Sequence, residues 1–162
     1  MSNNRRLIAG LVAAGLALFR ERDRLAGKTR KEASPPSRRV ATGTRIEYSP
    51  DLDGDADPGE VVWTWVPYED DPGKGKDRPV VIIGRTGGDL AGVPLTSKHK
   101  GPHCVPVGTG AWDRSGRPSY AKVEQLIVVR ARDVRREGAV LARDRFDDVV
   151  DGAARHHDLV RG

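Results

Sequence analysis

Cysteine is nearly absent from this sequence, since Cys104 is the single one among 162 residues. One cysteine excludes an internal disulfide, so we expect packing to stabilise the fold, and a reducing cytoplasm is the natural compartment. One cysteine also excludes the common structural zinc sites, whose cysteine and histidine ligands come in spaced pairs. We therefore expect no metal and no cofactor.

The sequence also lacks a hydrophobic run long enough to cross a bilayer. Residues 7–19 are mostly apolar and are flanked by charged residues, whereas a membrane-spanning helix needs about 20 apolar residues. A signal peptide is a second interpretation, but the charged continuation lacks a clean small-residue cleavage site. We prefer a helix within residues 1–27 that packs on the domain, a partner or a membrane surface. Membrane tethering through residues 7–19 is the weaker alternative.

Positive charge is in modest excess, and its distribution is uneven. The formal net charge is +5. Residues 1–49 carry 11 basic and 4 acidic side chains, residues 50–75 carry 1 and 8, and residues 76–162 carry 16 and 11. Residues 50–162 alone therefore come to −2, from 17 basic and 19 acidic side chains. Any contact of this part with nucleic acid has to come from locally placed arginines and lysines.

The composition divides the chain into three parts. Residues 1–27 hold the predicted helix. Residues 28–57 read as a polar linker, because a stretch rich in Lys, Arg, Ser and Pro is followed by an acidic turn and neither buries enough surface to fold. Residues 58–158 form the predicted folded domain.

The folded domain has the pattern of a small β-barrel. Residues 61–66 alternate, which places Trp63 and Trp65 on one face, and this pair is expected to mark the core or the working face. Residues 78–84 are apolar on both faces, as in a central strand. Glycine- and proline-rich turns separate three further predicted strands, and this spacing is typical of a small barrel. These strands are residues 93–96, 104–107 and 123–130.

The end of the domain changes to a helical pattern. Phe146, Val149, Val150 and Ala153 recur at helical spacing, with Asp144 as the expected N-cap. We expect this helix to cover one end of the barrel.

Several segments, in order, resemble the MazF/PemK family of toxins from type II toxin–antitoxin systems. Residues 59–63 read Gly-Glu-Val-Val-Trp, and after a polar loop residues 76–83 read Lys-Asp-Arg-Pro-Val-Val-Ile-Ile. Residues 94–97, Pro-Leu-Thr-Ser, and residues 123–127, Val-Glu-Gln-Leu-Ile, resemble two later strands of the family. The resemblance covers roughly residues 59–150. It implies an SH3-like barrel with a C-terminal helix, to which this chain appends an N-terminal helix.

The resemblance also implies an activity and partners. Family members cleave single-stranded RNA without a metal, because the ribose 2′-hydroxyl attacks the adjacent phosphorus. The products are a cyclic phosphate and a free 5′-hydroxyl. The resemblance further implies a homodimer with the RNA path across its interface, and a cognate antitoxin whose disordered tail fills the RNA groove.

The family pattern assigns the catalytic positions to Arg78 and Thr96. A guanidinium offers planar donors that match phosphate oxygens and stays charged, whereas threonine orients the phosphate or relays a proton. The alternatives are a surface arginine paired with an acid and an ordinary β-branched strand residue. Ser97 is the alternative hydroxyl if the register differs by one residue.

The loop before Arg78 departs from the family pattern. Many relatives carry a glutamate about five residues before the arginine, where this sequence has Gly73. If that glutamate is the base, a replacement has to come from Glu69, Asp70 or Asp77. The loop lysines Lys74 and Lys76 are candidates for phosphate contacts, although a solvated hairpin end is the simpler interpretation of the loop.

Four residues further along the chain are weaker candidates. Lys98 follows the predicted catalytic strand and is expected to bind RNA. Trp112 could stack on a base, although a tryptophan in a loop more often anchors that loop. His99 and His103 occupy a polar turn, where surface residues are a better interpretation than catalysts.

A second class of function uses the same scaffold without catalysis. Such a protein binds nucleic acid without cutting it, or poisons a protein target as gyrase-directed toxins of this fold do. Gly73 supports this alternative, and the Arg78–Thr96 pair opposes it.

Overall fold

The computed structural model describes residues 43–162, apart from the side chains of residues 136–138. The predicted N-terminal helix and the first part of the predicted linker lie outside the described residues. Within residues 43–162, no helix is long and apolar enough to span a membrane.

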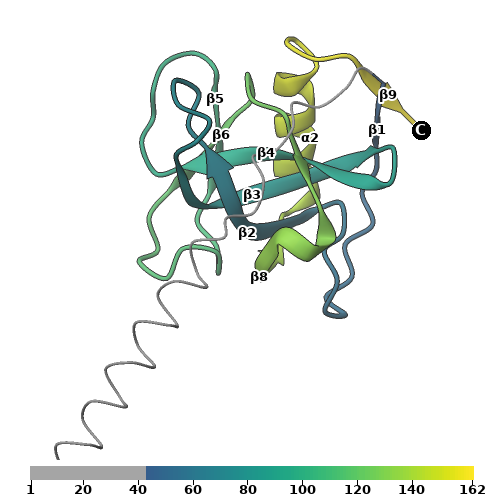
Figure 1. Ribbon diagram of the computed structural model, residues 1–162, viewed down its shortest axis with the longest axis horizontal. Coiled ribbons are helices and arrows are strands. Elements are labelled where there is room, and N and C mark those ends of the chain that lie inside the picture. The colour runs from purple at the N-terminus through teal and green to yellow at the C-terminus, as the bar shows by residue number, and fades with distance from the viewer. Residues whose placement is uncertain (1–42) are drawn as a thin grey trace, which may run out of the picture. The chain divides into compact units, whose positions relative to one another are not determined.

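Strands dominate the described part of the chain, and its one α-helix lies between the last two strands (Figure 1). The strands are β1 (Thr44–Ile46), β2 (Glu60–Pro67), β3 (Gly75–Thr86), β4 (Asp89–Thr96), β5 (Cys104–Gly108), β6 (Ser119–Lys122), β7 (Ile127–Val129), β8 (Val134–Val140) and β9 (Leu159–Arg161). A 3-10 turn, η1 (Ala131–Asp133), precedes β8, and the helix is α2 (Arg143–Ala153).

The strands form one strongly curled sheet around β3. Strand β3 pairs antiparallel with β2, β4 and β1, and β2 also pairs with β8. Strand β4 pairs with β7 along one part of its length and with β6 along another, and β6 continues to β5. Because the sheet curls on itself, it forms a half-barrel with α2 packed on it. The predicted mainly β fold with a C-terminal helix is therefore confirmed.

Strand β3 is buried on both faces, as its sequence predicts. Val81 and Ile83 join the larger apolar cluster, in which α2 takes part. Val80 and Ile82 point the other way and join a smaller cluster that includes Val62. The sheet thus separates two cores, and β3 contributes to both because its residues are apolar without alternation.

The beginning of the described part packs against the barrel. Strand β1 pairs with β3 and, in parallel, with β9. The Tyr48 hydroxyl donates to the Leu141 carbonyl oxygen at 3.0 Å, and its ring lies edge-on to Phe146. Residues 43–57, which the sequence analysis placed in a linker, therefore include a strand and an aromatic contact. The boundaries 1–27, 28–57 and 58–158 stay predictions.

One predicted strand differs from the structure. Residues 123–130 are expected to be extended throughout, but β7 covers only Ile127–Val129, and β6 precedes it at Ser119–Lys122. A turn separates the two, closed by a hydrogen bond from the Gln125 amide to the Lys122 carbonyl oxygen at 2.9 Å. Residues 119–129 therefore hold two strands, β6 and β7, which pair with different parts of β4.

Helix α2 forms where its periodicity predicts it, but its cap differs. Ala142 is the N-cap and makes no side-chain hydrogen bond, whereas Asp144 lies within the first turn. The prediction of Asp144 as the cap is wrong; its carboxylate instead favours the helix through the macrodipole. The helix lies close to the sheet at Gly152, where an added Cβ would come within 2.9 Å of Val105.

We predict that Phe146→Ala destabilises the fold by about 3–5 kcal/mol, because the ring is 1% exposed and its removal leaves a cavity under α2. Urea unfolding followed by circular dichroism measures the change. The control is Val160→Ala, since Val160 is 49% exposed and its truncation should stay within about 0.5 kcal/mol. Equal effects of the two substitutions would contradict the described core.

Candidate functional site

The sheet opens where β3 and β4 part. Their pairing ends at Val80 and Pro94, and β4 then pairs with β6 from Leu95 onwards. Pro79 and Pro94 both lack the N–H group that a continued ladder would need at this point. The parting leaves room between the beginning of β3 and the end of β4.

A cavity of about 290 Å³ occupies this opening, and we call it the basic pocket. Its lining comes from the beginning of β3, the end of β4 and the segment around β6. The lining residues are Trp63, Lys76, Asp77, Arg78, Pro79, Leu95, Thr96, Ser97, Lys98, Lys100, Asp113, Arg117, Ser119 and Lys122.

The lining of the basic pocket is strongly cationic. It includes six lysine or arginine side chains and two carboxylates, although residues 50–162 as a whole carry a net negative charge. Asp113 is engaged by Arg117, with Nε and Oδ2 2.9 Å apart, and by the Ser115 amide. The Ser115 hydrogen bond and Arg117 lower the pKa of Asp113. The remaining positive charge attracts an anion such as a phosphodiester.

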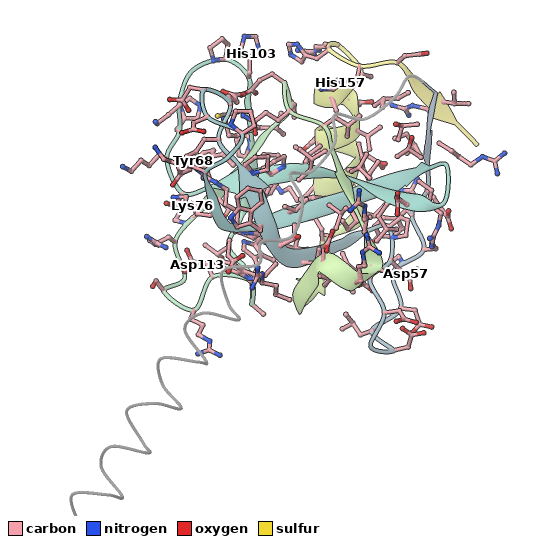
Figure 2. The ribbon with its side chains drawn as sticks, viewed as in Figure 1. Asp57, Tyr68, Lys76, His103, Asp113 and His157 are labelled. Atoms are coloured by element: carbon pink, nitrogen blue, oxygen red, sulfur yellow. The ribbon has the colours of Figure 1, made fainter. Side chains whose placement is uncertain are left out.

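The cations of the basic pocket lie close enough to affect one another. The pKa of Lys76 is lowered, first by the charge of Arg78, then by partial burial, and then by Lys98 and Lys100. Lys76 and Asp113 both line this pocket, and Figure 2 shows them at the left of the domain. A bound anion relieves this mutual repulsion, so the pocket is electrostatically prepared for one.

Arg78 and Thr96 line this one pocket from the neighbouring strands β3 and β4. Both are half-buried, and Arg78 lies opposite Thr64 of β2, which holds it in the ladder. The Thr96 hydroxyl oxygen accepts a hydrogen bond from the Lys98 amide at 3.2 Å, which fixes it at the end of β4. Ser97 lines the same pocket and is exposed. A guanidinium and a hydroxyl in one cationic pocket have the donors that would orient a phosphate.

The three carboxylates proposed as a base are separated by the structure. Asp77 lines the basic pocket, and its Oδ1 lies 3.1 Å from Nε of Arg135. Glu69 accepts a hydrogen bond from the Gln125 side chain and lines another cavity. Asp70 is exposed and lies outside the lining of the basic pocket.

The predicted RNA-binding residues also divide. Lys76 and Lys98 line the basic pocket. Lys74 instead pairs with Asp71 at 3.1 Å, beside Gly73, whose amide donates to the same carboxylate. The turn around Gly73 is therefore an ion-paired hairpin end, outside the basic pocket.

Trp112 is 3% exposed and anchors its loop. Its Nε1 donates to the Ser119 hydroxyl at 3.1 Å, and its carbonyl oxygen accepts from Nε1 of Trp63 at 3.0 Å. Gly110 is required beside it, because an added Cβ would meet the indole ring at 2.1 Å. A ring buried to this extent has no open face for a base, which fits the anchoring interpretation.

The two histidines weighed from the sequence lie outside the basic pocket. His99 is in contact with Tyr120 and His103 with His156, at ring-centroid distances of 5.1 and 4.8 Å. Both are exposed, as expected for surface residues. In the part of the chain that the structure describes, no three potential metal ligands are grouped to hold an ion.

Sequence reasoning missed part of the pocket. Lys100, Asp113, Arg117 and Lys122 come from segments that meet only because β6 pairs with the end of β4. The alternation of Lys98 and Lys100 after Thr96 is the one local pattern that indicates that Lys100 belongs to the pocket. No local pattern indicates this for Lys122.

The fold and this site define a small β-domain with a cationic pocket between two parting strands. Residues 57–156 match the model of a protein family described as the PemK-like, MazF-like toxin of type II toxin–antitoxin systems. The match covers more than half of the chain, so the chain belongs to this toxin family. The resemblance inferred from the sequence is confirmed.

Solved structures of MazF proteins are similar to this chain. The toxin MazF-mt6 of Mycobacterium tuberculosis is 18% identical, with a TM-score of 0.47, over 62% of this chain and 98% of that one. MazF of Deinococcus radiodurans is 20% identical, with a TM-score of 0.49, over 64% of this chain and 96% of that one. A MazE–MazF structure from the same organism is 19% identical, with a TM-score of 0.47, and the match covers 64% of this chain and 95% of that one. No curated protein matches the chain.

We predict that Arg78→Gln raises the pKa of Lys76 towards its ordinary value, because the charge of Arg78 is the largest cause of the lowering. Titration of the lysine Nζ and Cε resonances by NMR measures it. Arg145→Gln is the matched control, since Arg145 is an exposed arginine on α2 that pairs with Asp148. An unchanged pKa of Lys76 in Arg78→Gln would show that the two cations do not share the pocket.

Proposed function

We propose that this toxin is a metal-independent endoribonuclease that cleaves single-stranded RNA at the basic pocket. The observation that supports it most is the presence of Arg78 and Thr96 on two sides of one cationic cavity. The family membership supports the same activity, which the sequence resemblance implies. Cleavage of this kind needs a proton acceptor, donors for the phosphorane oxygens and a groove for the chain, and the pocket offers a candidate for each.

Each candidate has a role in the proposed reaction. Asp77 accepts the proton of the ribose 2′-hydroxyl, whose oxygen attacks the adjacent phosphorus. Arg78 and Thr96 bind the phosphorane oxygens. The P–O5′ bond breaks, and Lys76, whose pKa is lowered, gives a proton to the leaving 5′-oxygen. The products are a 2′,3′-cyclic phosphate and a 5′-hydroxyl end.

Asp77 takes the place of the glutamate that relatives carry in the loop. Its ion pair with Arg135 orients the carboxylate at the edge of the pocket. Arg135 is thus a positioning residue for the base.

We further propose a cognate antitoxin and a homodimer. An acidic segment of the antitoxin is the natural competitor of RNA, because its carboxylates suit the same six cations. Membership in a family of toxins from type II toxin–antitoxin systems supports such a partner.

Gly73 is the one observation that favours a non-catalytic alternative. A protein without the loop glutamate could bind RNA or a protein target at the basic pocket and leave it uncut. The same experiment separates the two functions, because binding without cleavage leaves the RNA intact.

We predict that the purified protein cuts a long RNA at discrete sites in excess EDTA and leaves 5′-hydroxyl ends. End-group analysis with a 5′-kinase, with and without prior phosphatase treatment, identifies those ends. RNA that is bound in a gel-shift assay but stays intact would support the non-catalytic alternative instead.

We predict that Arg78→Ala and Thr96→Ala each lower the cleavage rate by about 10²–10³-fold, because each removes a donor to the developing charge. Thr96→Ser should retain most of the activity, since it keeps the hydroxyl. Arg145→Ala is the control for loss of a surface arginine. If both variants fold like the wild type and cleave at its rate, these residues are not catalytic.

A further inference from the structure

A second cavity adjoins the basic pocket, and we call it the aromatic pocket. It has a volume of about 460 Å³ and is lined by Trp63, Asp77, Trp112, Asp113, Arg114 and Arg135. Three of these residues, Trp63, Asp77 and Asp113, also line the basic pocket. A chain bound with its phosphate in one cavity therefore has a neighbouring group within reach of the other.

The aromatic wall of this pocket is held in place before any ligand arrives. Trp63 Nε1 donates to the Trp112 carbonyl oxygen at 3.0 Å, and Trp112 is itself fixed by Ser119. The Trp63 ring is half-buried, so part of it faces the cavity. A fixed indole beside a phosphate site is suited to stacking a nucleobase at little entropic cost.

The rim of the aromatic pocket carries two guanidinium groups. Arg114 is exposed. Arg135 pairs through Nε with Asp77, and the two side chains are 46% and 47% exposed, so this pair can take a further ligand. The carboxylates of Asp77 and Asp113 stand beside them as acceptors.

We propose that the aromatic pocket is the specificity site of the enzyme and binds guanine from the nucleotide on the 5′ side of the cleaved bond. The proposal deepens and rests on the nuclease function. The position follows from Asp77, the proposed base, which lies at the boundary of the two pockets. The ribose whose 2′-hydroxyl it deprotonates lies at that boundary, and the base of the same nucleotide enters the aromatic pocket.

The choice of guanine follows from the rim chemistry. Guanine presents two adjacent acceptors, O6 and N7, which an arginine binds with two hydrogen bonds. Its N1–H and N2–H groups suit carboxylate acceptors. On the corresponding edge adenine and cytosine present an amino donor, and uracil presents one acceptor. Two arginines and the Asp113 carboxylate, beside the indole of Trp63, therefore favour guanine over the other three bases.

Relative cleavage rates test the proposal. Four short RNAs, identical except for the nucleotide 5′ of one cleavable bond, are compared in EDTA. The guanine substrate should be cut about 5- to 100-fold faster than the others, the discrimination expected of one bidentate contact. Arg135→Gln should reduce this ratio several-fold, and Arg145→Gln should preserve it. Because a loss of catalytic rate acts on all four substrates alike, the ratio reports recognition.

A binding measurement separates this proposal from the nuclease proposal. Trinucleotides with a 2′-deoxy sugar at the scissile position are titrated into the protein while the indole N–H signal of Trp63, assigned with Trp63→Phe, is followed by NMR. A shift induced by the guanine trinucleotide, at lower concentration than by the others, supports the specificity site even if no RNA is cut. Cleavage without guanine preference, a preference that survives Arg135→Gln, or an indole signal indifferent to the base would each overturn it.

Discussion

The parting of β3 and β4 is the constraint on which the site depends. Strand β4 pairs with β3 only as far as Pro94 and with β6 from Leu95 onwards, so the two pairings meet at this point. Pro79 and Pro94 lie at this point, and neither can donate to the ladder. The residues just beyond the last pair therefore face an opening instead of a neighbouring strand. Arg78 and Thr96 are the two whose chemistry suits a phosphate.

The rest of the domain holds this opening in a fixed shape. Strand β3 is anchored by two apolar cores, one on each face, and α2 completes the larger one. The loop that closes the far side is fixed by the buried Trp112, which joins β2 through Trp63 and β6 through Ser119. These contacts are apolar or neutral and use none of the cations around the opening.

The charges are arranged locally. A cationic pocket can therefore exist in a part of the chain, residues 50–162, whose net charge is negative. Six cationic side chains converge on one cavity, while the acidic residues 51–57 lie in the segment that packs near Glu60. Asp113 and Asp77 are each paired with an arginine. Such an arrangement attracts a polyanion to one place on the surface instead of to the whole molecule.

Periodicity in the sequence was sufficient to predict the central strands and α2, since residues 78–84 and Phe146 have unmistakable patterns. The division of residues 119–129 into β6 and β7 could not be predicted, because it depends on two different pairings with β4. Arg78 and Thr96 were singled out by resemblance, whereas Arg117 and Lys122 have no local signature. The separation of Glu69 from the pocket is likewise a tertiary effect, because the Gln125 side chain holds it beside another cavity.

The most direct test of the central claim is a crystal structure of the protein with a short RNA that carries a 2′-O-methyl group at the scissile nucleotide. The account predicts one phosphate in the opening, in contact with both the Arg78 guanidinium and the Thr96 hydroxyl. A phosphate chain that passes elsewhere on the barrel, or that touches one of the two without the other, would contradict it.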